Sequence, residues 1–231
     1  MTLTVATLRG ADRAAALDGL ARLRIAVFRE YPYLYDGTVD DEADYLADFF
    51  GSPDAVLVAA RDGDAIVGAA TASPMRDQTA DFRANFTGAG FDPETLFYFG
   101  ESVLLPEYRG RGIGHAFFDA REQAARDAGA RGAAFAAVIR ADDHPARPAG
   151  YRPLDPFWRA RGYAPVEGLT VSMDWKEVGE AVAVLKDRDE RAVLGAHGGA
   201  VKGGRVSSRH APAFCPPETA PPQEAVRRCQ R

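Results

Sequence analysis

Leu96–Gly132 reads LFYFGESVLLPEYRGRGIGHAFFDAREQAARDAGARG, and the rest of the chain is organised around it. Its apolar first part, Leu96–Leu105, predicts a buried strand. Apolar residues at helical spacing then predict a helix from about Gly112 to Ala128, with Gly129 as its C-cap. The first N–H groups of such a helix have no intrahelical partner and lie at the positive end of its dipole. The glycine-rich turn between strand and helix is therefore a candidate anion site.

The chemistry that this turn indicates is a pyrophosphate held by backbone amides. Its glycines let the backbone approach a phosphate closely, and Arg109 and Arg111 add charge-assisted donors. Two other phosphate motifs do not fit the sequence. A P-loop needs a Gly-Lys pair followed by Ser or Thr, which the chain lacks, and no G-x-G-x-x-G pattern opens a βαβ unit as in a Rossmann site.

The overall composition fits one globular domain with an appendage. The chain has 231 residues, of which 46% are hydrophobic, and its formal net charge of −5 gives no sign of nucleic-acid binding. No apolar run is long enough to cross a membrane, and the first residues lack the pattern of a signal peptide. Cys215 and Cys229 lie outside any metal or redox spacing. We therefore expect a cytoplasmic protein with no metal site, structural disulfide, membrane partner or nucleic-acid partner.

Further elements are predicted on both sides of the central stretch. Strands are expected at 2–8, 55–60, 66–73, 133–139 and 166–175, and helices at 12–30, 40–50 and 155–161. The strand at 133–139 is expected to be the parallel neighbour of Leu96–Leu105, through a right-handed crossover. The polar segment 74–95 is long for a loop, so we expect it near a substrate site. The acidic residues of 40–50 form either a solvated helix face or a surface that attracts a cationic substrate.

Two motifs in this chain have the spacing of a known family. Arg109, Gly112 and Gly114 follow the apolar strand as [Arg/Gln]-x-x-Gly-x-[Gly/Ala], and the later segment Phe157–Tyr163 reads FWRARGY. The first resembles motif A of the GNAT superfamily, the acyl-CoA-dependent N-acyltransferases, and the second is similar to that family's Phe-Tyr-x-Lys-x-Gly-Phe. The resemblance extends over residues 2–176 and is strongest from Leu96 to Tyr163.

The resemblance implies an α/β (α+β) fold. Its sheet would be mixed and mostly antiparallel, with two splayed central parallel strands flanked by helices. We assign the acetyltransferase domain to residues 1–179. Residues 180–231, which are rich in Gly, Pro and basic side chains, are expected to be a disordered tail, with a short strand at 181–185 as the one element they could add to the fold.

The resemblance also implies acetyl-CoA as cosubstrate, bound where the central strands splay apart. The pyrophosphate would meet the amides of Arg111 to Gly114, and the pantetheine arm would lie along Val103–Leu105. The thioester carbonyl would face a backbone donor at Leu104 or Leu105, which would stabilise an oxyanion. The cofactor-binding residues are therefore predicted to be Val103, Leu104, Leu105, Arg109, Gly110, Arg111, Gly112, Ile113, Gly114 and His115, the last of which contacts either phosphate or solvent.

Glu101 is the first candidate for the general base, because it is the one charged residue in the central strand and the family often has a glutamate there. A carboxylate among apolar neighbours has a raised pKa, which suits a base at neutral pH. The alternatives are a glutamate paired with a buried arginine, or one at a splayed strand end. Gly100 beside it predicts a β-bulge that orients Glu101.

The family's usual general acid, a tyrosine, is absent at its place, because Trp158 occupies that position. Tyr151 and Tyr163 are nearby substitutes. His144 titrates in the useful range and follows the second central strand, so it is a candidate acid or base, with a purely structural histidine as the alternative.

The acceptor is expected to be a small-molecule amine or a protein N-terminus. Tyr31, Tyr33 and Tyr35 lie in one predicted loop and either line its pocket or cover the edge of the core. The leading hypothesis is an acetyl-CoA-dependent N-acetyltransferase, with a homodimer as one option for its assembly. A non-catalytic acyl-CoA-binding regulatory domain and a protein that binds another nucleotide at the glycine-rich turn are the alternatives.

Overall fold

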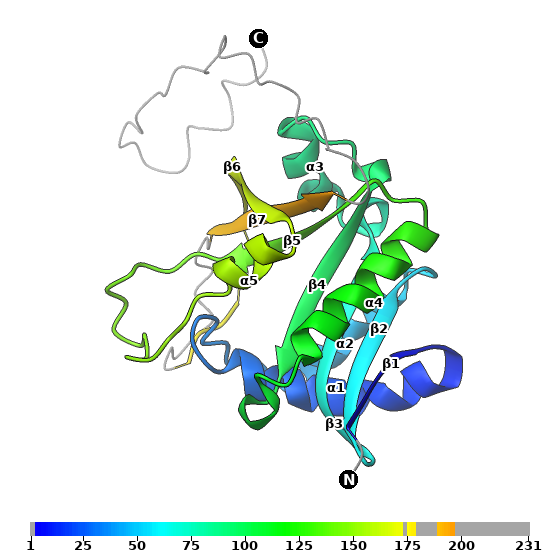
Figure 1. Cartoon of the computed structure of the whole chain (residues 1–231), viewed down its shortest axis with the longest axis vertical. Coiled ribbons are helices and arrows are strands. Elements are labelled where there is room, and N and C mark those ends of the chain that lie inside the picture. The colour runs from blue at the N-terminus through cyan, green and yellow to red at the C-terminus, as the bar shows by residue number, and fades with distance from the viewer. Residues whose placement is uncertain (1–2, 173–174, 179–188, 197–231) are drawn as a thin grey trace, which may run out of the picture.

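The computed structural model describes residues 3–172, 175–178 and 189–196, which form a twisted sheet with helices on both of its faces (Figure 1). The sheet has seven strands in the order β1-β2-β3-β4-β5-β7-β6. Only β4 and β5 are parallel, and all other neighbours are antiparallel. The strands are β1 Leu3–Leu8, β2 Val56–Asp62, β3 Ala65–Pro74, β4 Leu96–Leu104, β5 Gly132–Val138, β6 Tyr163–Ser172 and β7 Asp189–Ala196.

Helices divide between the two faces of this sheet. In Figure 1 α4 crosses the near face, while α1 and α2 lie behind the sheet. The core is divided accordingly, because one buried cluster joins α4 to the strands and a second joins α1 and α2 to the other face of β2, β3 and β4. The helices are α1 Gly10–Phe28, α2 Val39–Phe50, α3 Ala80–Gly88, α4 Ile113–Asp127 and α5 Asp155–Ala160, with 3₁₀ turns at Met75–Asp77, Pro93–Thr95 and Pro106–Tyr108.

The two parallel strands are paired at one end and splayed at the other. Hydrogen-bonded register joins Leu96–Tyr98 of β4 to Gly132–Ala134 of β5 and then stops, although both strands continue. Among the described residues, the edge of β4 that faces β5 is therefore left without a strand partner from residue 99 onward. This confirms the predicted mixed sheet with two splayed central parallel strands.

A β-bulge lies where the splay begins. The register of β3 and β4 places Ala70 opposite Ser102 but Ala72 opposite Phe99, so two residues of β4 face Thr71 alone. One of them is Gly100, at which an added Cβ would lie 2.5 Å from the Thr71 hydroxyl oxygen. The bulge predicted from Gly100 is thus confirmed, and the reason for glycine is the close approach of the Thr71 side chain.

Most predicted elements are present, with shifted ends. Helix α1 begins at Gly10, two residues before its predicted start at residue 12, and follows an extended Arg9. The segment 74–95 contains α3 and packs against β6, at the end of the sheet where β4 and β5 are still paired. That is the end of the sheet away from the splay, and the expectation that this segment lies near a substrate site stays a prediction.

Residues 189–196 correct the predicted domain boundary. The domain was expected to end at residue 179, but β7 lies between β5 and β6 and pairs with both. Such pairing uses backbone hydrogen bonds, which nearly any sequence can make, so composition gave no sign of it. The strand expected at 181–185 and the rest of the 180–231 tail lie outside the described residues.

Candidate active site

The glycine-rich turn leaves the first amides of α4 open. Gly110 and Gly112 have φ of +76° and +81°, in the left-handed region that glycine adopts at low cost. Gly112 is the N-cap, no side chain caps the helix, and its first turn has no acidic residue to offset the dipole. The amides that follow Gly112 are therefore available to an anion.

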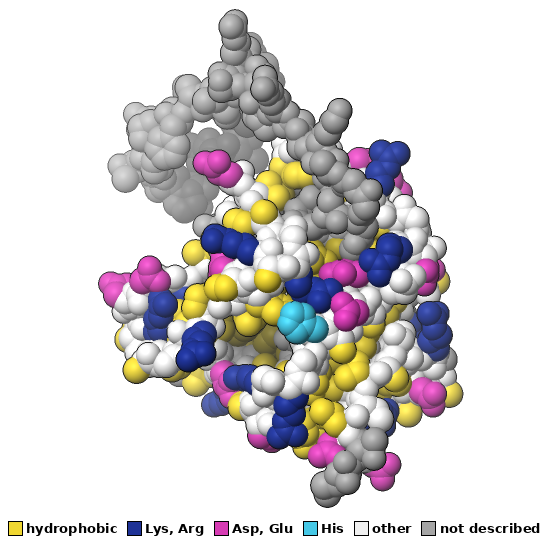
Figure 2. Space-filling view, viewed as in Figure 1, with side chains coloured by type: hydrophobic (Ala, Val, Ile, Leu, Met, Phe, Trp, Pro, Cys, Tyr) yellow, Lys and Arg dark blue, Asp and Glu magenta, His cyan; other side chains and the backbone are white. Residues whose placement is uncertain are grey.

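A hollow adjoins this turn. Figure 2 shows it over the lower half of β4, beside the first turns of α4, with hydrophobic side chains inside it and Lys and Arg side chains around its rim. Its position matches the splay between β4 and β5. An elongated ligand with an anionic end could therefore lie with its charge at the α4 N-terminus and its thinner end along β4.

The backbone of β4 decides which amide faces the splay. The Leu105 N–H donates to Val67 O at 3.0 Å, toward β3. Since successive amides of an extended strand point to opposite sides, the Leu104 N–H points toward the β5 side. Of the two predicted donors for a thioester carbonyl, only the Leu104 N–H is oriented for that role. The side chain of the preceding residue, Val103, is fully buried against α1 on the other face of the sheet.

The two arginines of the turn hold the turn itself. Arg109 donates from Nε to Leu104 O at 3.2 Å and forms an ion pair with Glu30 at 3.0 Å. Arg111 donates to Glu107 O at 2.9 Å and lies over the Tyr108 ring. Both are exposed, so each could turn toward a phosphate.

Helix α5 packs against the start of α4 and borders the same hollow. The Phe157 ring contacts the His115 ring, with centroids 4.9 Å apart, and lies 3.7 Å from the position of a Cβ at Gly114. Arg161 joins the two segments through Asp119 at 2.6 Å and Glu122 at 2.9 Å. The residues of the second sequence motif thus form one wall of the predicted cofactor site.

Neither aromatic residue near the family's usual acid position offers a free phenol. Trp158 packs on Phe135 of β5, with ring centroids 5.0 Å apart. The Tyr163 hydroxyl donates to Glu122 at 3.2 Å and the residue is 3% exposed. Burial, followed by the carboxylate of Glu122, raises the pKa of Tyr163. Tyr163 is therefore poorly placed to donate a proton to a departing thiolate.

Glu101 lies in a buried ionic cluster on the α1 and α2 side of β4. Its Oε1 is 2.8 Å from Nη1 of Arg24, and its Oε2 accepts a hydrogen bond from the Tyr45 hydroxyl at 3.1 Å. Arg24 also pairs with Glu42, and the three charged side chains are less than 10% exposed. This is the pairing with a buried arginine that the sequence left open as the alternative reading of Glu101.

The cluster carries two carboxylates for one guanidinium. Burial alone would lower the pKa of Arg24, but Glu101, Tyr45 and Glu42 raise it, so Arg24 stays charged. Sequence reasoning missed both Arg24 and Glu42. The available signal was that Arg24 lies midway between Leu20 and Phe28 at helical spacing, on the buried face of α1.

The three candidate tyrosines diverge. Tyr31 lies edge-on to Tyr151, with centroids 4.7 Å apart, and 5.7 Å from the His144 ring. Tyr33 packs on Phe28 at the edge of the core. Tyr35 covers the buried cluster, where burial and then the carboxylate of Glu42 raise its pKa. The structure therefore brings Tyr31, His144 and Tyr151 together and separates the other two.

His144 has a defined hydrogen-bond role. Its Nδ1 accepts from the Ala146 N–H at 3.2 Å, so in the neutral ring the proton is on Nε2. In that tautomer Nε2–H can donate a hydrogen bond to a ligand, and no ring nitrogen is free to accept a proton. The acid and base roles of His144 stay predictions.

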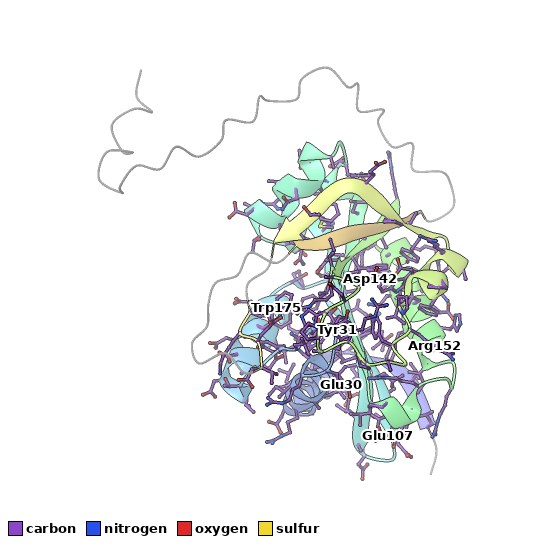
Figure 3. All side chains as sticks on the ribbon, turned by 90° about the vertical axis from the view of Figure 1, so that its left-hand side faces the viewer. Glu30, Tyr31, Glu107, Asp142, Arg152 and Trp175 are labelled. Carbon is purple, nitrogen blue, oxygen red and sulfur yellow. The ribbon has the colours of Figure 1, made fainter. Side chains whose placement is uncertain are left out.

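Side chains from distant segments hold the loop that carries Tyr31. Arg140 donates to Pro32 O at 2.7 Å and to Tyr33 O at 2.9 Å, and pairs with Glu177. In Figure 3 Tyr31 lies near the centre of this face, with Asp142 above it and Trp175 to its left. The end of α1, the segment after β5 and residues 175–178 therefore meet around one aromatic cluster.

Two other classes of feature are absent from the part of the chain that the structure describes. No helix there is long and apolar enough to cross a membrane. In the same residues no group of three or more His, Cys, Asp or Glu side chains could hold a metal ion.

Comparison with known proteins agrees with this geometry. The model of the acetyltransferase (GNAT) family matches residues 20–149, and no curated protein matches the sequence. Similar solved structures include a ribosomal-protein-alanine N-acetyltransferase from Brucella melitensis, with TM-score 0.55, 13% identity, and coverage of 84% of this chain and 99% of that one. The structure of yncA from Salmonella typhimurium with its cofactor acetyl-CoA has TM-score 0.52, 13% identity, and coverage of 93% and 100%. A GCN5-related N-acetyltransferase from Kribbella flavida has TM-score 0.50, 18% identity, and coverage of 84% and 98%.

Proposed function

Because the chain belongs to the GNAT acetyltransferase family, whose cosubstrate is acetyl-CoA, we propose that it transfers an acetyl group from acetyl-CoA to a primary amine by direct attack. The observation that carries the proposal is the splay of β4 and β5 beside the uncapped N-terminus of α4. It supplies backbone donors for a pyrophosphate and, along β4, a free strand edge for an amide-bearing arm.

The donor would be held mainly by backbone. The amides after Gly112 would bind the pyrophosphate, with Arg109 and Arg111 turning to it, and the pantetheine arm would extend the sheet beside Ser102–Leu104. The Leu104 N–H would then meet the thioester oxygen and stabilise the charge that develops on it during attack. His115 and Phe157 would border the phosphate end.

The reaction forms a C–N bond and breaks the C–S bond of the thioester. The acceptor nitrogen must be neutral to attack, and it loses one proton as the amide forms. Glu101 is the proposed destination of that proton. Since its carboxylate is buried, the proton would reach it through the Tyr45 hydroxyl, which donates a hydrogen bond to Glu101.

The departing thiolate is a tolerable leaving group, so an acid assists it without being indispensable. We assign that role to the cluster of Tyr31, His144 and Tyr151, in which the phenol of Tyr151 is the candidate proton donor and the Nε2–H of His144 can donate a hydrogen bond to the departing sulfur. Tyr31 would also contact the acceptor. Tyr33 would support this loop by packing on Phe28, and Tyr35 would cover the buried cluster beside Glu42.

A non-catalytic acyl-CoA-binding domain is the second candidate. Two observations favour it: Trp158 lies at the usual acid position, and Glu101 is ion-paired. Turnover distinguishes the two, because this alternative predicts tight CoA binding without acetyl transfer.

The proposed acceptor is a primary amine, either on a small molecule or at a protein N-terminus, in the cytoplasm. The catalytic domain would extend at least through β7, since that strand completes the sheet.

The first test is the thermal stability of the purified protein with acetyl-CoA, ATP or NAD added separately. A ligand that binds only the folded state adds about 2.7 kcal/mol at a hundredfold excess over its Kd. A higher Tm with acetyl-CoA alone is expected, followed by thiol release with at least one member of a panel of polyamines, amino acids and N-terminal peptides. An unchanged Tm in a folded sample contradicts the proposal, and a Tm raised more by ATP or NAD would assign the turn to another nucleotide.

A further inference from the structure

Arg121 is an unusual buried cation in the third turn of α4. It is 1% exposed, and within the described residues no carboxylate forms an ion pair with it. Its guanidinium instead lies between two rings, with Cζ 4.5 Å from the centroid of Phe99 and 4.7 Å from that of Phe118. Burial lowers the pKa of Arg121 to about 10, so the group remains charged at neutral pH. A charge held in the core without a carboxylate partner needs another reason to be there.

Arg121 donates to backbone carbonyls, two of which lie at the β-bulge and one in α4 itself. Nη1 lies 3.4 Å from Thr71 O and 3.3 Å from Glu101 O, and Nε lies 3.3 Å from Phe117 O. Thr71 and Glu101 are the residues at which the register of β3 and β4 shifts, so the sheet ladder is interrupted there. A guanidinium has several donors in a fixed plane, which lets one side chain bind carbonyls from two strands at once.

The same bulge is held from its other side by Thr71. The Glu101 N–H donates to the Thr71 hydroxyl at 3.2 Å, so the amide and the carbonyl of Glu101 are both bound outside the normal ladder. The peptide groups of Glu101 are thereby fixed in one orientation. The strand edge Ser102–Leu104 follows directly, and it is the edge proposed to meet the pantetheine arm and the thioester.

We propose that Arg121 is a positioning residue, which locks the β4 bulge to α4 and so sets the thioester-binding edge of β4 relative to the amides at the α4 N-terminus. The inference rests on the proposed function for its catalytic consequence, but its structural part stands separately. One rigid helix would then carry both the pyrophosphate amides and the clamp on the strand that receives the thioester. Small misplacements of reacting groups are costly in rate, so such a clamp is expected to affect kcat more than binding.

The test uses Arg121→Met, which keeps the length and apolar packing of the stem but removes the donors. Arg121→Lys keeps a charge and some donors, and Arg126→Met is the matched control, because Arg126 is an exposed arginine of the same helix bound to Gln123. Three quantities are measured for each folded variant: amide hydrogen exchange of residues 99–105, Kd for CoA, and kcat for transfer from acetyl-CoA to hydroxylamine. Hydroxylamine is small and largely neutral at pH 7, so it needs no specific acceptor pocket.

For Arg121→Met we expect exchange in 99–105 to accelerate about tenfold or more and kcat to fall about tenfold or more, while Kd for CoA changes less than about threefold. Arg121→Lys should recover part of both losses, and Arg126→Met should match the wild type. Unchanged exchange in 99–105, or losses of kcat and CoA binding that only follow the unfolded fraction, would overturn the proposal.

A second variant decides the case if Arg121→Met does not fold. Thr71→Val removes the hydroxyl that accepts from Glu101 and leaves Arg121 in place, so it should loosen the same segment and lower kcat in the same direction. Unaltered exchange and kcat in both Thr71→Val and Arg121→Lys would count against the clamp. If the wild type neither binds acetyl-CoA nor acetylates hydroxylamine, the proposed function fails, and hydrogen exchange still decides whether Arg121 holds the bulge.

Discussion

The two sides of β4 are constructed from different parts of the chain. On the α4 side, the site consists of backbone groups: the unpaired edge of β4 and the amides that follow Gly112. On the α1 and α2 side, it consists of charged side chains, with Arg24 between Glu42 and Glu101. The first side is suited to a cofactor that presents a constant pyrophosphate and amide arm. The second is suited to a chemical step that depends on charge and protonation.

This difference gives the two sides different weaknesses. A backbone site is damaged by bulk or negative charge in the space that the ligand needs, and the fold is largely indifferent to such changes. A buried ionic cluster is damaged by removal of one member, because the others are left without a partner. Substitutions on one side should therefore change ligand affinity, while those on the other should change stability and rate.

Arg24→Met should have the largest effect, and it should act on stability. The substitution leaves Glu42 and Glu101 buried without their cation, which typically costs about 3–5 kcal/mol. Unpaired buried carboxylates have raised pKa values, so the folded variant would bind more protons than its unfolded state, and its stability should increase as pH falls from 7 toward 5. Urea unfolding at pH 7 and pH 5 measures both effects.

The control for Arg24→Met is Arg22→Met on the same helix. Arg22 is exposed and pairs with Asp18 across one turn, so its loss should cost less than about 0.5 kcal/mol. Equal costs for the two substitutions, or an Arg24→Met variant that loses stability as pH falls, would show that the cluster is not the charged support described here.

Gly114→Glu should have the next largest effect, and it should act on affinity. The carboxylate would repel the pyrophosphate at the α4 N-terminus and displace at least two charge-assisted hydrogen bonds, each worth about 1.5 kcal/mol or more. The Kd for CoA should therefore rise about a hundredfold. Calorimetric titration with CoA measures it. The fold should tolerate the change, because the nearest atom to an added Cβ is 3.7 Å away, in the Phe157 ring.

Gly114→Ala is the matched control for that variant. Its methyl group makes an ordinary contact and carries no charge, so Kd for CoA should stay within about threefold of the wild type. If Gly114→Glu binds CoA as well as Gly114→Ala does, the pyrophosphate does not lie at this helix end.

The same contrast explains how much of the molecule could be predicted from the sequence. The cofactor side requires glycines at fixed spacing after an apolar strand. This local pattern predicted the bulge at Gly100 and the open turn at Gly112, and its resemblance to the GNAT family implied the splayed sheet. Here the residues that build the site are neighbours in the chain. Their spacing alone therefore carries the information.

The other side could not be predicted in this way, because its partners come from elements far apart in the chain. Glu42 was grouped with the acidic residues of a solvated helix face, yet it is 1% exposed and pairs with Arg24 of another helix. Arg121 was missed for the same reason, since its partners are carbonyls of two strands. β7 was missed because backbone pairing leaves no mark in composition.

Glu101→Gln separates the two roles of the cluster. If Glu101 is the base, kcat should fall about ten- to a hundredfold and the acidic limb of the pH–rate profile should shift, while Kd for CoA stays nearly unchanged. Steady-state rates between pH 5 and 9 with the best acceptor amine measure this. The matched variant is Glu42→Gln. Glu42 forms an ion pair with Arg24, as Glu101 does, but in the described contacts it makes no hydrogen bond with Tyr45. An equal loss in both variants, with no change in profile, would remove Glu101 from the base role.

Asp41→Asn should have the smallest effect, and it tests whether the acceptor side depends on the first turn of α2. Asp41 and Thr38 form a capping box in which the Thr38 N–H donates to the Asp41 carboxylate at 2.9 Å. Asp41 directly precedes Glu42 in the chain. Loss of the charge should cost about 0.5–1 kcal/mol at pH 7, measured by urea unfolding. Because the proposed CoA site lies on the other side of β4, the Kd for CoA should not change.

The pH dependence of that cost has a defined sign. Hydrogen bonds from Thr38 lower the pKa of Asp41 in the folded protein, so the folded state binds fewer protons than the unfolded state as the carboxyl titrates. The stabilisation is complete above the ordinary pKa of about 3.9 and is lost as pH falls through the lower folded value. The difference between wild type and Asp41→Asn should therefore be constant from pH 7 to 5 and shrink below pH 4. A difference that grows as the solution is acidified would mean that the Asp41 carboxylate does not stabilise α2 through its charged form, and that the position of Glu42 is fixed by Arg24 alone.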